Sequence, residues 1–184
     1  TVLVPENDTA PAMNTATCKV CGFALQKPVG IKNGTCGENV YWTLDSNGKL
    51  TVYGTGRMTD YRLENYPDST SPFFDLTGIK SLVIKTGVTS VGDYAFFRQS
   101  ALTALTLPNI LTAIGTEAFG SCVALETLRL PGSLQTIGTQ AFACCDGLTS
   151  LTIPAGVTLL IPFDSANTMY TTQARNTGTY TTPT

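Results

Sequence analysis

A 23-residue repeat runs through the middle of the chain and constrains its fold more than any other feature. The segment that starts at Leu102 aligns without a gap with the one that starts at Leu125. Another copy starts at Ile79, and a fourth starts at Leu148 and keeps the pattern only to about residue 160. Periods of about 20–50 residues are typical of proteins in which each unit buries its apolar face by stacking on its neighbours. The sequence therefore predicts a stack of three full coils and one incomplete coil.

Each repeat opens with alternating apolar and polar residues. Leu105 and Leu107 are two residues apart and share one face of an extended strand, whereas Ala104 and Thr106 lie on the other face. Proline follows this strand in three of the four copies, and a residue without a backbone N–H cannot continue a hydrogen-bonded ladder. We therefore expect one short strand per repeat, with its leucine face turned inward. The prolines are Pro108, Pro131 and Pro154.

The second half of each full repeat carries a further apolar pair, a glycine and an Ala-Phe pair. A strand, a turn, a second extended piece and a short extended or helical return make up one coil. A period of about 20–29 residues with an L-x-x-L-x-L opening is that of leucine-rich repeats. The predicted fold class is therefore a β-rich leucine-rich-repeat solenoid. Its predicted core includes Leu105, Leu128, Phe119 and Phe142.

Two alternating segments precede the repeats. Residues 40–44 and 50–53 both alternate with period two, and Asn47-Gly48 between them is a strong hairpin signal. Trp42 lies on the apolar face of this hairpin. We expect that face to cover the open end of the first coil, as an N-terminal β-hairpin cap.

The remaining segments have no repeat pattern. Residues 57–78 carry Phe73 and Phe74, and we expect an irregular connection whose aromatic side chains plug the core. After Ile161 the chain is rich in Thr, Asn and Gly, which indicates a terminal strand or cap remnant followed by a linker. The predicted organisation is an N-terminal extension with C-x-x-C (1–35), a hairpin cap and connection (36–78), leucine-rich repeats (79–170) and a Thr-rich tail or linker (171–184).

Two of the six cysteines share one position of the repeat. Cys122 and Cys145 are 23 residues apart. They form either a ladder of buried thiols, whose S–H groups donate to backbone carbonyls, or a disulfide if their Cα atoms lie about 4.4–6.8 Å apart. Free cysteine packs well in a core, which favours the ladder. Cys144 is expected to point elsewhere.

Three other cysteines precede the hairpin. Cys18-x-x-Cys21 resembles half of a zinc site, and Cys36 follows it. A closed structural zinc site needs four ligands, and this set is one ligand short. A disulfide within the set, or an unfilled remnant of a zinc knuckle, is the favoured interpretation, so no metal or cofactor is predicted.

Composition excludes several chemistries. The chain has no histidine, so Ser-His and Cys-His nucleophile pairs are excluded. Its formal net charge is −2, which indicates no surface for nucleic acid. No apolar run of about 18 residues occurs, so membrane insertion is not expected. With no G-x-S-x-G elbow and no phosphate-binding loop, we predict that the chain is not an enzyme.

The repeat core GVTSVGDYAF (87–96) resembles that of the BspA-like leucine-rich-repeat family. CGENVYWTL (36–44) with GKLTVYGTG (48–56) is similar to the leader segment that precedes those repeats in bacterial surface proteins. The resemblance covers residues 36 to about 160. It implies a secreted or surface-attached bacterial protein with a curved solenoid, which binds host or neighbouring-cell proteins or mediates adhesion. Because the chain starts at Thr1 with no signal-like segment, we expect that a signal peptide has been removed.

The outward positions of the repeat strands form the predicted binding surface. This surface is flat and weakly charged, and apart from Arg129 it has few of the residues that contribute most of the binding energy at protein interfaces. A structural spacer, or an accessory domain of a larger modular surface protein, fits the same surface. The candidate binding residues are Val83, Thr106, Glu126 and Arg129 on or beside the strands and the loop aromatics Tyr61, Tyr66 and Phe97.

Overall fold

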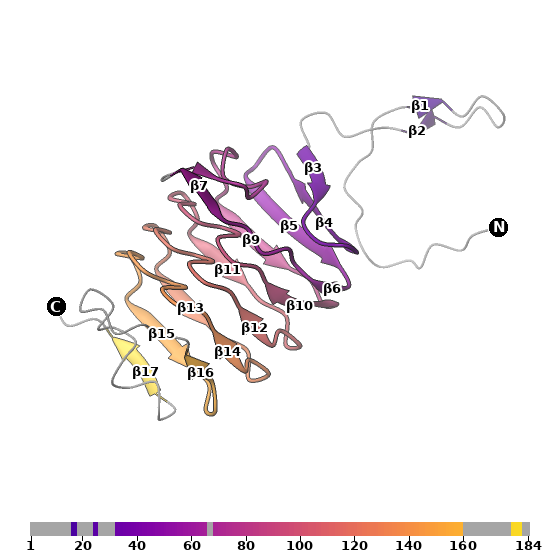
Figure 1. Cartoon of the computed structure of the whole chain (residues 1–184). Helices are drawn as coiled ribbons and strands as arrows, with labels where there is room; N and C mark the ends of the chain where they lie inside the picture. Colours follow the sequence, from indigo (N-terminus) through magenta and orange to yellow (C-terminus); the bar gives the residue numbers. More distant parts are fainter. Residues whose placement is uncertain (1–15, 18–23, 26–31, 66–67, 160–177, 182–184) are drawn as a thin grey trace. The chain divides into compact units, whose positions relative to one another are not determined.

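The computed structural model describes residues 16–17, 24–25, 32–65, 68–159 and 178–181 (Figure 1). The chain divides into two compact units, Thr1–Ile31 and Lys32–Thr184. In the first unit, β1 (Ala16–Thr17) pairs antiparallel with β2 (Ala24–Leu25). The described residues are β-strands, turns and bends, and among them no helix has the length and hydropathy needed to cross a membrane.

The first sheet of the second unit joins the hairpin to the repeats. Its order is β11-β9-β5-β4-β3. The strands β3, β4 and β5 pair antiparallel, and β5, β9 and β11 pair parallel. The hairpin therefore extends the sheet of the first repeats, because its second strand lies directly beside β9. The strands are β3 (Lys32–Thr35), β4 (Val40–Leu44), β5 (Lys49–Gly54), β9 (Ser81–Ile84) and β11 (Ala104–Thr106).

The second sheet is parallel throughout and contains the second extended piece of each repeat. Its order is β16-β14-β12-β10-β6. Ser90 pairs with Ala113 and Ala113 with Thr136, which keeps the 23-residue spacing, but Thr136 pairs with Thr158. The register thus slips by one residue where the sequence repeat decays. The strands are β6 (Gly56–Arg57), β10 (Val88–Val91), β12 (Ala113–Ile114), β14 (Thr136–Ile137) and β16 (Thr158–Leu159).

A third sheet follows the first one along the chain. It has the order β13-β15-β17, with β13 (Thr127–Arg129) parallel to β15 (Ser150–Ile153) and β17 (Gly178–Thr181) antiparallel to β15. Strands β11 and β13 therefore belong to different sheets, although the second sheet is continuous across the same two repeats. Strands β7 (Leu63–Asn65) and β8 (Asp68–Ser69) form a separate antiparallel pair.

The core is built around a column of stacked phenylalanine rings. Neighbouring ring centroids lie 4.8 Å apart between Phe73 and Phe96, 5.4 Å between Phe96 and Phe119, and 5.5 Å between Phe119 and Phe142. Trp42 of the hairpin meets the end of the column edge-on, 5.4 Å from Phe73. All four phenylalanines are at most 1% exposed. The column thus links the hairpin to three successive repeats through one continuous aromatic contact.

The expectation of an irregular connection at residues 57–78 is wrong, as the aromatic column shows. Phe73 precedes Phe96 by the length of one repeat and occupies the same place in the stack. The strands β5 and β6 pair with β9 and β10, so this segment follows the path of a diverged coil. It was not recognised in the sequence because the β7–β8 hairpin lengthens the coil and shifts its strands out of the 23-residue register. The plug predicted for Phe73 is confirmed.

The burial of the predicted core residues differs between repeats. Leu128, Phe119, Phe142 and Trp42 are buried, as predicted. Leu105 is only half-buried and packs at the margin of the core. The strand that carries Leu105 is unpaired on the side facing β13, since the two strands belong to different sheets. The β-rich leucine-rich-repeat class is confirmed. The expectation of an extended or helical return segment is wrong for the described repeats, because these segments are successive turns closed by bonds such as that from the Phe97 N–H to the Tyr94 carbonyl.

Candidate binding surface

The outer face of the first sheet carries two of the predicted binding residues. Val83 and Thr106 are Cα partners, and Thr51 of the hairpin is the partner of Val83 on its other side. Thr106 is exposed and Val83 is half-buried. Leu82, which precedes Val83 in β9, is 1% exposed. Because side chains alternate across a strand, this row points away from the core. The sheet thus places these short side chains in one line.

Arg129 and Glu126 lie outside this row. Both side chains are exposed, on or next to β13. Arg129 pairs with Thr152 in the third sheet and has no partner in the first. The structure therefore brings Val83 and Thr106 together and places Arg129 and Glu126 on the neighbouring sheet.

The three loop aromatics have different environments. Tyr61 is half-buried against the core, where burial raises the pKa of its hydroxyl group, and its N–H donates to the Asp93 carbonyl at 2.9 Å. Phe97 is 4% exposed and packs edge-on against Tyr94, with ring centroids 6.0 Å apart. The expectation that Phe97 offers an exposed ring is wrong, because its ring lies over the bare backbone of Gly120. Tyr66 lies outside the described residues.

The exposed aromatic side chains that the sequence interpretation missed are in the hairpin. Tyr41 and Tyr53 are 40% and 41% exposed, and their ring centroids lie 5.9 Å apart. Both alternate with buried residues of β4 and β5, so they occupy the outer face of the same sheet as Val83. The period-two pattern of residues 40–44 and 50–53 already places both tyrosines at outward positions, opposite the apolar face on which the prediction of a cap rests.

The thiol ladder predicted for the repeat cysteines is confirmed. The Cys122 thiol donates to the Phe96 carbonyl at 3.3 Å, and the Cys145 thiol donates to the Phe119 carbonyl at 3.2 Å. Both are free thiols, and Gln99 takes the same place one repeat earlier, where its amide donates to the Phe73 carbonyl at 2.8 Å. Burial raises the pKa of both thiols, that of Cys145 to about 12. Cys144 is exposed, as expected.

Cys36 is a buried free thiol in the core of the second unit. Burial raises its pKa to about 12, which makes it a poor thiolate ligand. Cys18 and Cys21 lie outside the described residues. In the part of the chain that the structure describes, no three cysteine or acidic side chains are grouped to hold a metal ion.

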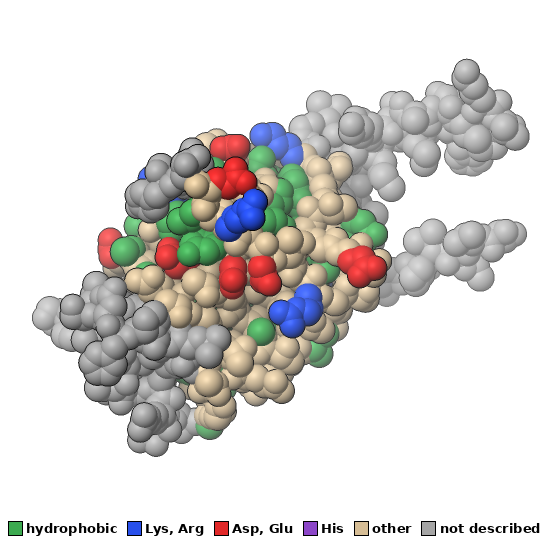
Figure 2. Space-filling view, viewed as in Figure 1, with side chains coloured by type: hydrophobic (Ala, Val, Ile, Leu, Met, Phe, Trp, Pro, Cys, Tyr) green, Lys and Arg blue, Asp and Glu red, His purple; other side chains and the backbone are tan. Residues whose placement is uncertain are grey.

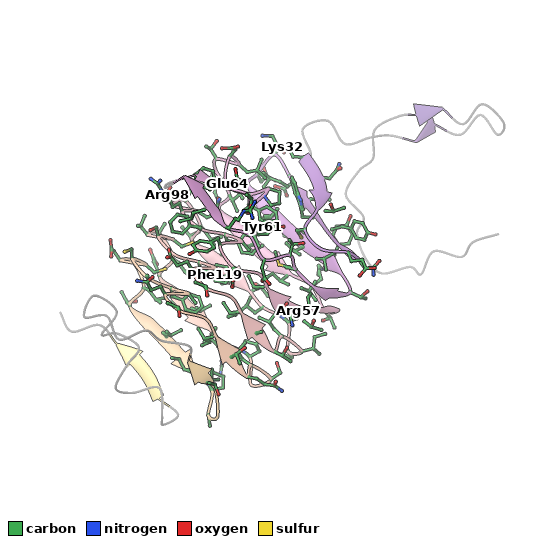
Figure 3. The ribbon with its side chains drawn as sticks, viewed as in Figure 1. Lys32, Arg57, Tyr61, Glu64, Arg98 and Phe119 are labelled. Carbon is green, nitrogen blue, oxygen red and sulfur yellow. The ribbon has the colours of Figure 1, made fainter. Side chains whose placement is uncertain are left out.

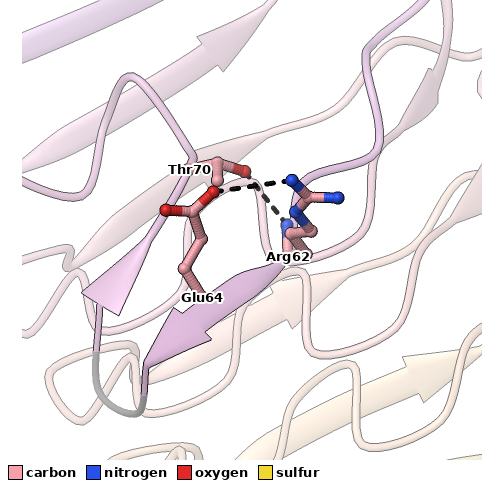
Figure 4. A network of polar contacts seen from close by, with 3 residues as sticks. All are labelled: Arg62, Glu64 and Thr70. Atoms are coloured by element: carbon pink, nitrogen blue, oxygen red, sulfur yellow. Dashed lines mark hydrogen bonds and ion pairs between the residues drawn. The ribbon is translucent and has the colours of Figure 1, made fainter.

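Charged side chains are dispersed over the surface. On the face seen in Figure 2, acidic and basic groups lie singly or in small groups among polar and apolar atoms. Figure 3 shows Phe119 within the stack, whereas Glu64 and Arg98 project at its edge. In the β7–β8 hairpin, the Arg62 guanidinium lies 3.5 Å from the Glu64 carboxylate and the Arg62 N–H donates to the Thr70 hydroxyl (Figure 4). Exposed pairs of this kind contribute little to stability.

Comparison with known families accounts for the repeat. The model of the BspA-type leucine-rich-repeat region matches residues 70–165 in six copies. The chain belongs to this family. The match starts at residue 70, within the diverged coil that carries Phe73. No curated protein matches the chain.

Solved structures of bacterial leucine-rich-repeat proteins resemble this family member. A leucine-rich-repeat protein of Eubacterium ventriosum is 22% identical, with a TM-score of 0.57, and the match covers 74% of this chain and 41% of that one. A leucine-rich-repeat protein of T. pallidum is 23% identical, with a TM-score of 0.48 and coverage of 69% and 64%. A leucine-rich cell surface protein of Faecalibacterium prausnitzii is 20% identical, with a TM-score of 0.41 and coverage of 71% and 50%. The first similarity supports the fold, and the chain spans less than half the length of that protein.

Proposed function

We propose that the chain is a non-enzymatic protein-binding or adhesion module whose coils form a solenoid capped by the hairpin. The observation that supports this most directly is the outer face of the first sheet. Val83, Thr106 and Thr51 lie side by side on a sheet whose opposite face is buried, so their geometry is fixed before any partner arrives. A preformed surface loses little conformational entropy on binding. Arg129, with its exposed guanidinium, adds a residue type that is common at the centres of interfaces.

We further propose a secreted or cell-surface location and a partner on a host or neighbouring cell. Membership of the BspA-type family and the similarity of residues 36–56 to a surface-protein leader support this. The proposed organisation is an extension (1–35), a cap and connection (36–78) whose residues 57–78 follow a diverged coil, repeats (79–170) and a tail (171–184).

A surface-binding assay with the full chain tests this function. Purified chain is immobilised, and capture of proteins from the surface of candidate host or neighbouring cells is compared for the unmodified chain and for T106E and R129E. Both variants are expected to lose capture, because T106E places a negative charge on the outer face of the first sheet and R129E reverses the charge of Arg129 on the neighbouring sheet. R57E, on β6 of the second sheet, is the matched control and should keep it. Capture that is the same for all four chains would contradict the proposed face, and no specific capture would favour the structural spacer.

A further inference from the structure

Two exposed tyrosines touch one another on the outer face of the first sheet. Tyr41 in β4 and Tyr53 in β5 are Cα partners, with ring planes inclined by 32°. Among the described residues, the other large exposed apolar side chains are Ile110 and Val123, which lie in turns of later repeats. Single exposed apolar residues are ordinary, whereas two tyrosines in contact concentrate a residue type enriched at interface centres.

The sheet holds these two rings in place. β4 is paired on both sides, by β3 and β5, and β5 is paired by β4 and β9. On the opposite face, Trp42 and Val52 are 6% and 0% exposed, so the backbone below the tyrosines is anchored in the core. A tyrosine has few rotatable bonds, and on such a backbone it loses little entropy when a partner binds.

Lysines lie on the strand face that carries the tyrosines. The strands β3, β4, β5, β9 and β11 contain no aspartate or glutamate. Lys49 lies on the same face of β5 as Tyr53, and both are exposed. Lys85 directly follows β9, is exposed, and donates its N–H to the Val52 carbonyl at 2.8 Å, which places it beside Tyr53. The strands of this face thus carry lysine and no acidic side chain, whereas Glu38 and Asp45 lie in the turns at the two ends of β4.

We infer that the row Tyr41–Tyr53–Lys85 binds an extended acidic segment of a protein partner that lies across the strands. Alternate side chains of an extended peptide are about 6.6 Å apart, close to the 5.9 Å between the ring centroids. Two successive side chains on one face of the segment can thus contact the two rings, while the next one, a carboxylate, reaches Lys85. Lys49 adds attraction along the same face. The inference rests on the proposed function and specifies the chemistry of the partner.

The test uses a synthetic peptide whose alternate positions match this row. The fluorescein-labelled octapeptide Ser-Tyr-Ser-Tyr-Ser-Glu-Ser-Glu places two tyrosines and then two glutamates on one face. It is titrated with the full chain and followed by fluorescence anisotropy at low and at physiological salt. We expect saturable binding with a Kd below about 1 mM, which weakens as salt rises. The double variant Y41A/Y53A and the variant K85E should each weaken binding about tenfold or more.

Two controls make the result specific. R57E, on the other sheet, should bind the peptide like the unmodified chain, and a peptide with lysine in place of glutamate should not bind. Circular dichroism of each variant establishes that the exposed substitutions leave the fold intact. Absence of saturable binding below about 1 mM, or equal binding by Y41A/Y53A, overturns the inference.

A third arm separates a protein ligand from a carbohydrate. Polygalacturonate is an anionic polysaccharide, and binding of this probe that depends on Tyr41, Tyr53 and Lys85 in the absence of peptide binding overturns the peptide assignment. Failure of the inference is distinguishable from failure of the proposed function. In the first case, cell-surface capture still responds to T106E and R129E. In the second case, it does not.

Discussion

Glycine occupies one position of each of the three full repeats because the coils approach one another too closely there for a side chain. A Cβ atom on Gly115 would meet the backbone and carboxylate of Asp93, and one on Gly138 would meet the backbone of Thr116. The same Asp93 carboxylate accepts the Thr116 N–H at 2.6 Å, so the space beside Gly115 is filled by a hydrogen bond between coils. Backbone contacts of this kind cannot move aside as the end of a flexible side chain can.

The substitution G115A is therefore expected to lower the free energy of unfolding by about 1–3 kcal/mol. Urea unfolding followed by circular dichroism measures this loss. Gly132 is the matched control, because a Cβ there meets nothing within 4 Å, and G132A should change stability by about 0.5 kcal/mol or less. Equal effects of the two substitutions would show that the coils are not in close contact at Gly115.

The buried thiols predict a loss of stability at alkaline pH. In the unfolded chain a thiol ionises near its ordinary pKa of 9.0, whereas in the folded chain burial holds the pKa of Cys145 at about 12. Between these values the folded state retains a proton that the unfolded state has lost. The free energy of unfolding therefore decreases as pH rises through this window, by about 1.4 kcal/mol per pH unit for one thiol.

Urea unfolding between pH 8 and pH 10.5 under reducing conditions measures this slope. The variant C145S retains a hydrogen-bond donor without the thiol and should show a shallower slope. C144S removes an exposed thiol and should keep the original slope. An unchanged slope in C145S would contradict the assignment of the effect to the ladder.

At the scale of the elements, the aromatic column determines how neighbouring coils are aligned. Phe119 stacks on Phe96 on one side and on Phe142 on the other, with ring planes inclined by 17° and 1°. Its side chain is 0% exposed, so its contacts are made entirely within the core. The column also contains Phe73, and this contact integrates the diverged coil with the regular ones.

Truncation of a side chain in the column is expected to lower the free energy of unfolding strongly. F119A should lower the free energy of unfolding by about 3–5 kcal/mol, because it removes a fully buried ring and leaves a cavity between two others. F74A is the control, since Phe74 is only half-buried and lies outside the column, and a loss well below that of F119A is expected. Chemical denaturation of both variants makes the comparison. A similar loss of unfolding free energy in both variants would contradict a larger contribution of the column to stability.

At the scale of the whole second unit, stability depends on contacts between coils, since each coil meets only its neighbours. The strand ladder is interrupted between β11 and β13, but the second sheet and the return segments remain bonded there, as in the Phe119 N–H bond to the Ala141 carbonyl at 2.8 Å. The strand leucines on the two sides of this interruption differ in burial. Leu128 is 5% exposed, whereas Leu105 is half-buried.

L128D is therefore expected to abolish cooperative unfolding, because it buries an unpaired charge among the coils. L105D should destabilise less and retain a cooperative transition, since a half-buried carboxylate keeps contact with water. R129D, one residue from Leu128 but exposed, should leave the transition nearly unchanged. Thermal melts followed by circular dichroism compare the three variants. A cooperative melt in L128D would contradict the stacked arrangement.

The sequence by itself determined the repeated elements of this protein. The 23-residue period, the alternation around Leu128 and the matching cysteines follow from local pattern, because side chains of a strand alternate strictly between its faces and because equal positions of stacked coils meet. For the same reason, the ladder of Cys122 and Cys145 could be predicted from their spacing.

The tertiary structure decided what local pattern does not encode. The insertion of β7 and β8 hid the diverged coil from the repeat, and only the stacking of Phe73 on Phe96 restores its register. Phe97 is buried because it packs across a neighbouring coil onto Gly120, a contact between residues distant in sequence. The exposed face also depends on which strands become neighbours. Tyr53 lies beside Lys85 because β5 pairs with β9, and that pairing is a property of the folded chain.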